Sequence, residues 1–240
     1  MTGAKKFFLS IVILATFLPS GFSQQAQKVP SEKRSVLVNV IDAHGNAVRD
    51  LTKDNFHVRV NGKPAVVLDA RYSLAPRRIV LLLDMSGSMI AETASGKWRI
   101  AREAADDLLA ETPAEMPIAM LTFSRKVGDV FDFSQGRAAI AKWLKEGPGR
   151  RSNLQGGTAL FDAILEGLKL LQPVQPGDAV YAITDGGDNV SHALADGTEL
   201  ALLQSDVRLF AFLFADHDVD PVEQEGRRFF LSMVADTGGL

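Results

Sequence analysis

The apolar run at residues 79–83 is the feature that most constrains the fold. Five consecutive hydrophobic residues, Ile-Val-Leu-Leu-Leu, lead directly into Asp84. A strand with one face in water alternates apolar and polar residues, whereas a continuous apolar run is typical of a strand buried on both faces, as in a parallel sheet. The polar residues that follow the run should therefore emerge at the edge of a sheet, where we expect a site.

Strand-like and helix-like patterns alternate from residue 77 onward. Helical spacing of apolar residues separates the apolar runs, as in 100–109. This alternation predicts right-handed crossovers and an α/β fold with a doubly wound, mostly parallel sheet flanked by helices. Ligands of such sheets bind beyond the carboxyl ends of the strands. The predicted strands are 78–84, 117–123, 179–185 and 207–214.

A small β unit is predicted before this domain, at residues 35–73. Valines alternate with other residues at 36–40, and Phe56, Val58 and Val60 alternate with polar residues, which indicates short strands. Asn61-Gly62 is a hairpin-turn signal because both residue types tolerate positive φ, and residues 42–46 mark another turn. This unit either covers a flank of the larger domain or has a binding role of its own.

The first residues predict an exported protein. Lys5 and Lys6 precede an apolar stretch at 7–18, and small residues follow it, so residues 1–23 are interpreted as a signal peptide and 24–34 as a polar spacer. The apolar stretch is shorter than the roughly 20 residues that span a bilayer, and an uncleaved anchor is the alternative. After cleavage no membrane span is expected, and the location would be periplasmic or secreted. The chain has no cysteine and hence no disulfides.

Composition and charge argue against two classes of partner. The net charge is -3, and the Lys and Arg residues form no block longer than a pair. Nucleic-acid binding needs a basic patch or stripe, and binding to a membrane surface has the same requirement. Neither partner is expected.

Five oxygen-bearing side chains are the candidates for a metal site. Asp84, Ser86 and Ser88 recur at alternate positions, so an extended backbone would direct their oxygens to one side. Thr158 follows two glycines at the start of a predicted helix, and Asp185 ends a predicted strand. These are hard ligands without histidine or sulfur, which suits magnesium, manganese or calcium better than zinc. Two carboxylates and three hydroxyls would leave a coordination position for exchangeable water.

Three motifs resemble a known family. "DMSGSM", "GGTALFDAI" and "ITDGGDN" occur in the order of the metal-ion-dependent adhesion site of von Willebrand factor type A domains. The segment "VLVNVIDAHGNAVRDLTKDNFHVRVNGKPAVVL" is similar to the part preceding this domain in exported bacterial, especially acidobacterial, relatives. Together the resemblance covers about residues 36–240. The end of the chain, "FFLSMVADTGGL", resembles a helix that leads into a further strand and helix, so the domain at 77–240 is expected to lack these two elements.

The resemblance implies a Rossmann-like domain that binds a partner protein through a metal ion. Ser86, Ser88 and Thr158 would supply hydroxyl ligands, while Asp84 and Asp185 would bind the ion directly or through water. Magnesium is the expected ion, with manganese or calcium as alternatives. A partner's Asp or Glu would take the exchangeable position, which is the chemistry of an adhesion module and not of an enzyme.

Other interpretations stay open at the level of sequence. Considered without the other motifs, Thr158 is explained as an ordinary helix N-cap, and Asp185 is explained as a turn residue. A metal-independent scaffold subunit is the main alternative. A magnesium-dependent phosphotransferase with Asp84 as nucleophile is less favoured, because Ser86 stands where that chemistry usually places a second carboxylate. Asp216, Asp218 and Asp220 have calcium-loop spacing but lack the required glycine and glutamate, which indicates a solvated loop.

Overall fold

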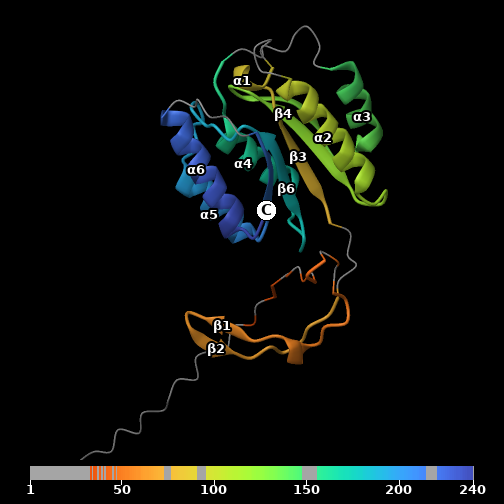
Figure 1. The fold of residues 1–240 in the computed structure, drawn as a ribbon, viewed down its shortest axis with the longest axis vertical. Coiled ribbons are helices and arrows are strands. Elements are labelled where there is room, and N and C mark those ends of the chain that lie inside the picture. The colour runs from red at the N-terminus through yellow and green to blue at the C-terminus, as the bar shows by residue number, and fades with distance from the viewer. Residues whose placement is uncertain are drawn as a thin grey trace, which may run out of the picture. The chain divides into compact units, whose positions relative to one another are not determined.

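The computed structural model describes residues 48–72, 77–90, 96–147, 156–214 and 221–239, together with scattered positions between 33 and 46. Figure 1 shows their arrangement. The predicted signal peptide, almost all of the spacer and the acidic segment 216–220 lie outside the described residues. In the part that the structure describes, no helix is long and apolar enough to cross a membrane.

A two-stranded antiparallel hairpin forms where the Asn61-Gly62 signal predicts one. Strand β1 (Val58–Val60) pairs with β2 (Lys63–Ala65), and Val60 lies opposite Lys63. The two loop residues have φ values of 50° and 76°, the left-handed conformation that a two-residue hairpin turn needs. A single 3-10 turn, η1 (Lys53–Asn55), precedes the hairpin. The turn prediction is confirmed, whereas a separate domain at 35–73 stays a prediction.

The turn predicted at residues 42–46 is also present. Asp42 Oδ1 accepts hydrogen bonds from the backbone N–H groups of His44 and Asn46, both at 2.8 Å. Val48 N–H donates to Val40 O at 2.9 Å across the turn. The aspartate side chain thus replaces backbone partners in a tight loop, as Asx turns do.

A five-stranded sheet forms the centre of the larger domain, in the order β5-β4-β3-β6-β7. All neighbouring pairs are parallel except β4 and β5, which are antiparallel. The mostly parallel α/β fold is therefore confirmed. Its strands are β3 (Ile79–Asp84), β4 (Ile118–Phe123), β5 (Val127–Phe131), β6 (Ala179–Thr184) and β7 (Arg208–Leu213).

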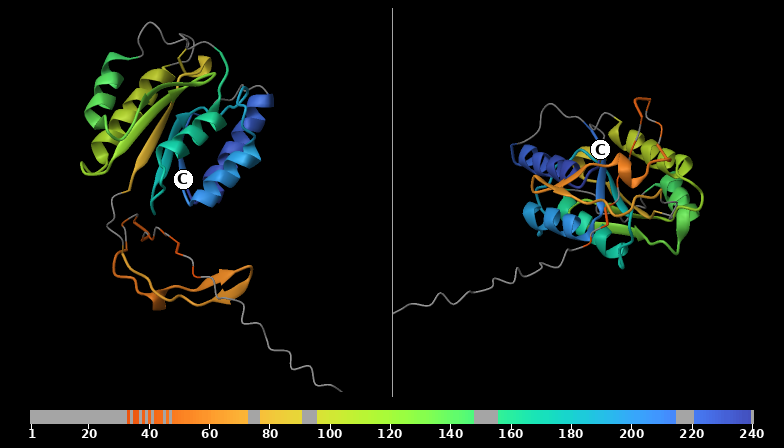
Figure 2. Two further views of the ribbon diagram at one scale, coloured as in Figure 1. Left: turned by 180° about the vertical axis from the view of Figure 1, so that it is seen from behind. Right: turned by 90° about the horizontal axis from the view of Figure 1, so that it is seen from below.

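The helices cover both faces of the sheet, as Figure 2 shows from two further directions. Alternate residues of the strands explain this arrangement. Val80 and Leu82 of β3 point toward the second group of helices, while Leu81 and Leu83 point toward the first group. The first group is α1 (Gly87–Ile90), α2 (Lys97–Glu111) and α3 (Gly136–Glu146), and the second is α4 (Leu160–Leu170), α5 (Ala195–Ser205) and α6 (Pro221–Asp236).

Strand β3 lies at the point where the strand order reverses. Residues 80–83 of this strand are fully buried, so the continuous apolar run has the double-sided burial that it predicts. The chain continues from β3 to β4 on one side, and β6 pairs on the other side. The crevice at the carboxyl end of such a strand is the usual ligand site of open parallel sheets.

Candidate functional site

Asp84 ends β3 and is the most enclosed of the candidate ligands. Asp84 is fully buried, and two neighbouring groups donate hydrogen bonds to its carboxylate. Ser86 N–H donates to Oδ1 at 2.8 Å, and the Thr184 hydroxyl, at the end of β6, donates to Oδ2 at 2.6 Å. The carboxylate is therefore fixed between the ends of two adjacent strands.

The backbone after Asp84 does not remain extended as predicted. It turns into the short helix α1, in which Ser86 O accepts from Met89 N–H and Ile90 N–H at 3.0 and 3.1 Å. Ser88 lies within this helix, so the predicted alternation along an extended strand is wrong. The helical turn nevertheless brings the two hydroxyls to within 3.1 Å of each other. Ser86 is buried and Ser88 is exposed, which places Ser88 at the rim of the cluster.

Thr158 reaches the same edge of the sheet from the start of α4. Gly87 N–H donates to Gly156 O at 3.4 Å, and Ala159 N–H donates to Ser124 O at 2.7 Å, which fastens this segment to the loops after β3 and β4. The helix begins two residues after Thr158, with Ala159 at its N-cap position and no side-chain cap. The Thr158 side chain is buried without serving as the N-cap. This removes the capping explanation for the residue.

The loop after β6 carries Asp185 and also positions Thr158. Thr158 N–H donates to Asn189 Oδ1 at 2.8 Å, while Asn189 N–H donates to Thr158 O at 3.0 Å. Asp188 Oδ2 accepts from Phe161 N–H at 3.0 Å and from the Ser191 hydroxyl at 2.5 Å. Asp188 therefore holds the loop against α4.

Asp185 follows β6 and is nearly buried. Its carboxylate Oδ2 lies 3.4 Å from the Lys97 ammonium, at the first residue of α2. Gly186 comes next with a φ of 81° and turns the chain away from the strand. Sequence reasoning missed Lys97, Thr184 and Asn189, since only the fold brings them to the candidate residues.

Burial and charge together perturb Asp84. Burial of its carboxyl is the main cause that raises its pKa from 3.8 to about 7, and the charge of Asp185 adds to the rise. Hydrogen bonds from Thr184 and Ser86 oppose this shift. Burial likewise raises the pKa of Asp188. A buried acid beside a second acid is an arrangement that a bound cation would relieve.

The chemistry of the donors fits a hard divalent cation. Two carboxylates, two paired hydroxyls and a third hydroxyl on an adjoining loop are the ligand types that magnesium takes. Across the described ranges, no group of three or more His, Asp or Glu side chains forms a metal cluster. A cation at this edge of the sheet would thus depend on the serine and threonine oxygens.

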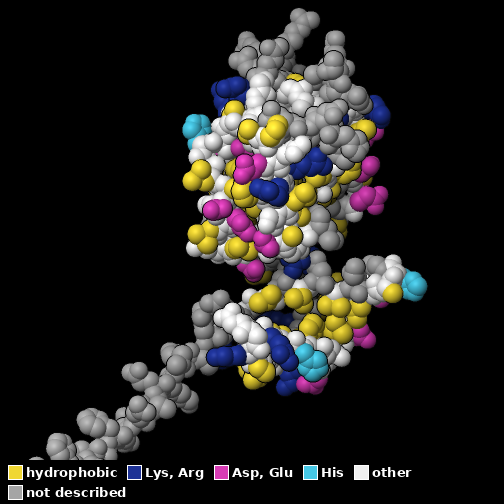
Figure 3. Space-filling model, turned by 60° about the vertical axis from the view of Figure 1, so that its left-hand side comes forward, with side chains coloured by type: hydrophobic (Ala, Val, Ile, Leu, Met, Phe, Trp, Pro, Cys, Tyr) yellow, Lys and Arg dark blue, Asp and Glu magenta, His cyan; other side chains and the backbone are white. Residues whose placement is uncertain are grey.

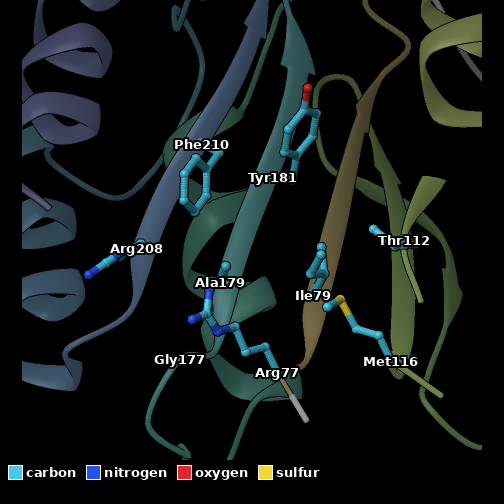
Figure 4. A pocket seen from close by; sticks show the side chains of 9 residues that line it. All are labelled: Arg77, Ile79, Thr112, Met116, Gly177, Ala179, Tyr181, Arg208 and Phe210. Atoms are coloured by element: carbon cyan, nitrogen blue, oxygen red, sulfur yellow. The ribbon is translucent and has the colours of Figure 1, made fainter. Parts of the chain in front are cut away.

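A shallow apolar hollow of about 240 Å³ lies at the opposite ends of the strands. Figure 4 shows its lining, with Ile79, Ala179 and Arg208 at the starts of β3, β6 and β7. Asp84 and Thr184 end the same strands. The hollow is therefore separate from the candidate site.

Charged side chains of both signs lie on the face drawn in Figure 3, where they are interspersed with hydrophobic ones.

Comparisons with known proteins agree with this architecture. A sequence profile of the von Willebrand factor type A domain matches residues 79–187. An aerotolerance-related membrane protein from Bacteroides fragilis superposes with a TM-score of 0.51 at 15% identity, covering 66% of this chain and 88% of the other. BatB from Bacteroides thetaiotaomicron gives 0.50 at 16% identity, covering 66% and 87%. No curated protein sequence matches the chain significantly.

The fold and the sequence match define a class of protein. Residues 79–187 match the von Willebrand factor type A domain, and the larger domain around them has a Rossmann-like α/β fold. Domains of this family are in general protein-interaction modules and not enzymes. The two structural neighbours are similar in fold, and the match of residues 79–187 includes Asp84, Ser86, Ser88, Thr158 and Asp185.

Proposed function

We propose that this protein is an exported binding module that holds a divalent cation and uses it to bind an acidic side chain of a partner protein. The ligands would be Asp84, Ser86, Ser88, Thr158 and Asp185, and magnesium is the ion that we expect. The observation that carries the proposal is the gathering of the Asp84 carboxylate, the Ser86–Ser88 hydroxyl pair and the Thr158 segment at one edge of the sheet.

Hydrogen bonds hold two of the proposed ligands, Asp84 and Thr158, in place. Thr184 and Ser86 orient the Asp84 carboxylate through two hydrogen bonds, so little side-chain freedom remains to be lost on binding. Asn189 fixes the backbone of Thr158 from the other side. Such positioning by neighbouring groups is what a metal site needs, because the ligands must lie within a few tenths of an ångström of their bonded distances.

The exposed side of the cluster suits a partner's carboxylate. Ser88 is exposed and Asp84 is buried, so solvent reaches the cluster from the side of α1. A divalent ion bound there would keep a position that a partner's Asp or Glu can occupy. The chain would supply neutral hydroxyls on that side, which leaves the ion attractive to an anion.

A calorimetric titration tests the metal site. The purified protein is titrated with MgCl₂ and then MnCl₂, beside Asp84→Ala and, as a matched control, Asp107→Ala on the exposed face of α2. Both variants lose one carboxylate, so general charge effects are equal. We expect saturable binding by the parent and by Asp107→Ala, and none by Asp84→Ala. Absence of binding by all three proteins would favour the metal-independent scaffold.

Export is tested separately on the cells that make the protein. We expect the periplasmic or released fraction to contain a chain that begins near residue 24, as N-terminal sequencing would show. A chain recovered in the cytoplasm with its first residues intact would contradict the export part of the proposal and leave the metal part standing.

A further inference from the structure

Lys97 places a positive charge of the chain itself against a proposed metal ligand. Its ammonium lies 3.4 Å from Asp185 Oδ2, and the two side chains are only 12% and 10% exposed. Charges that are withdrawn from water in this way interact more strongly than exposed pairs, because neither solvent nor salt screens them well. The contact is therefore a substantial part of the electrostatics of the site.

We infer that Lys97 is a tethered cation that competes with the divalent ion for Asp185 and thereby lowers the metal affinity of the site. The inference rests on the function proposed above. Once Asp84 loses its proton, Asp84 and Asp185 carry two negative charges, and Lys97 balances one of them. A divalent ion would balance both, and an ammonium left beside it would repel it. Metal binding therefore requires the ammonium to leave Asp185.

The position of Lys97 in the fold allows this movement. It is the first residue of α2 and follows Gly96, whose φ is 81°. The amino end of a helix disfavours positive charge, so the dipole of α2 opposes the ammonium at this position. A lysine side chain also turns about four flexible bonds, unlike the planar fork of an arginine. One consequence is that the site fills only at higher concentrations of magnesium than the same ligands would need without Lys97.

Metal titration of a Lys97→Gln variant is the first test. The matched control is Lys169→Gln, which removes the same charge near the far end of α4, where the exposed Lys169 pairs with the half-buried Glu166. At fixed ionic strength we expect Lys97→Gln to bind MgCl₂ at least about tenfold more tightly than the parent, and Lys169→Gln to bind like the parent. Equal affinity of Lys97→Gln and parent would overturn the inference and leave the metal site intact. If none of the proteins binds, the proposed function fails and the inference fails with it.

Chemical labelling of lysines in the unmodified protein is the second test, and it does not depend on the folding of a variant. Acetylation of each lysine is followed by mass spectrometry with and without MgCl₂, with Lys169 as the internal standard. We expect Lys97 to be labelled several-fold faster when magnesium is present, while the labelling rate of Lys169 stays unchanged. A labelling rate of Lys97 that magnesium does not change would contradict the inference.

Discussion

The Thr184 hydroxyl donates a 2.6 Å hydrogen bond to Asp84 Oδ2 and joins the carboxyl ends of β6 and β3 inside the domain. The same hydroxyl oxygen accepts from Gly186 N–H at 3.0 Å. Thr184 thus links the carboxylate of one strand to the loop that carries Asp185. Both groups are fully buried, so neither has water as a substitute partner.

Thr184→Val therefore removes two buried hydrogen bonds while it keeps the shape of the side chain. We expect the free energy of unfolding to fall by about 1–3 kcal/mol, because the carboxyl and the Gly186 N–H lose their partners. Urea unfolding measures the change. Thr184→Ser, which retains the hydroxyl, should lose much less stability. Equal losses in the two variants would mean that the missing methyl group, and not the hydrogen bonds, causes the effect.

The raised pKa of Asp84 predicts how stability depends on pH in the absence of metal. In the folded protein the carboxyl keeps its proton up to about pH 7, whereas the unfolded chain releases it near 3.8. The unfolded state binds fewer protons between these values, so stability falls as the pH rises from about 4 to about 7 and then levels off. Urea unfolding in EDTA at a series of pH values measures this slope. Asp84→Asn should show a smaller fall over the same range.

The same shift predicts that acid weakens metal binding. A divalent ion needs the ionised carboxylate, which is the minor form below the Asp84 pKa of about 7. We expect the magnesium affinity to drop about tenfold between pH 8 and pH 6, because the ionised fraction of Asp84 drops by that factor. Calorimetric titrations at the two pH values measure it. An unchanged affinity would show that Asp84 is ionised throughout and that its burial is offset by its partners.

Four of the five strands of the sheet were predictable, because burial on both faces requires a nearly continuous run of apolar residues. Each predicted strand corresponds to a strand of the structure, and the predicted and observed ends agree within one residue. The predicted ranges are 78–84, 117–123, 179–185 and 207–214. Strand β5 was not predicted. Its sequence, Val-Gly-Asp-Val-Phe, is mostly exposed at the antiparallel edge of the sheet and contains residues that are depleted in strands.

The candidate ligands were proposed from the sequence and stay a prediction, whereas the groups that hold them in place could not be proposed from it. Thr184 stands directly before Asp185, yet its hydrogen bond to Asp84 depends on β6 pairing with β3. Lys97 reaches Asp185 from α2, which is far from Asp185 in the sequence, and no sequence pattern fixes the distance between them. Contacts between residues far apart in the sequence depend on the topology of the fold, which local periodicity does not encode.

Gly157→Ala should disturb the Thr158 segment through simple lack of space. A methyl group there would lie 2.3 Å from Asn189 Oδ1 and 2.6 Å from Val190 Cγ1. The Asn189 side chain must then move away from the Thr158 N–H group, whose hydrogen bond its Oδ1 accepts. We expect at least about a tenfold loss of magnesium affinity, since small displacements of ligands are costly.

Gly197→Ala is the matched control for this change. Gly197 lies in α5, and a methyl group there meets nothing within 4 Å. Because alanine favours helix over glycine by about 1 kcal/mol, this variant should be slightly more stable and should bind magnesium like the parent. A normal metal affinity in Gly157→Ala would show that Asn189 is not needed to position Thr158.

The Arg78–Asp178 pair gives a prediction that separates stability from binding. Arg78 donates to the buried Asp178 carboxylate through Nε at 3.1 Å and also to Leu171 O at 2.7 Å. Both residues lie at the amino ends of β3 and β6, away from the candidate site. Asp178→Ala would leave the arginine without its buried counter-charge, and we expect unfolding to become easier by about 3 kcal/mol. Urea unfolding measures this loss, and calorimetry should give the parental magnesium affinity as long as the variant is folded. A weakened affinity in folded Asp178→Ala would mean that the two ends of the sheet are coupled.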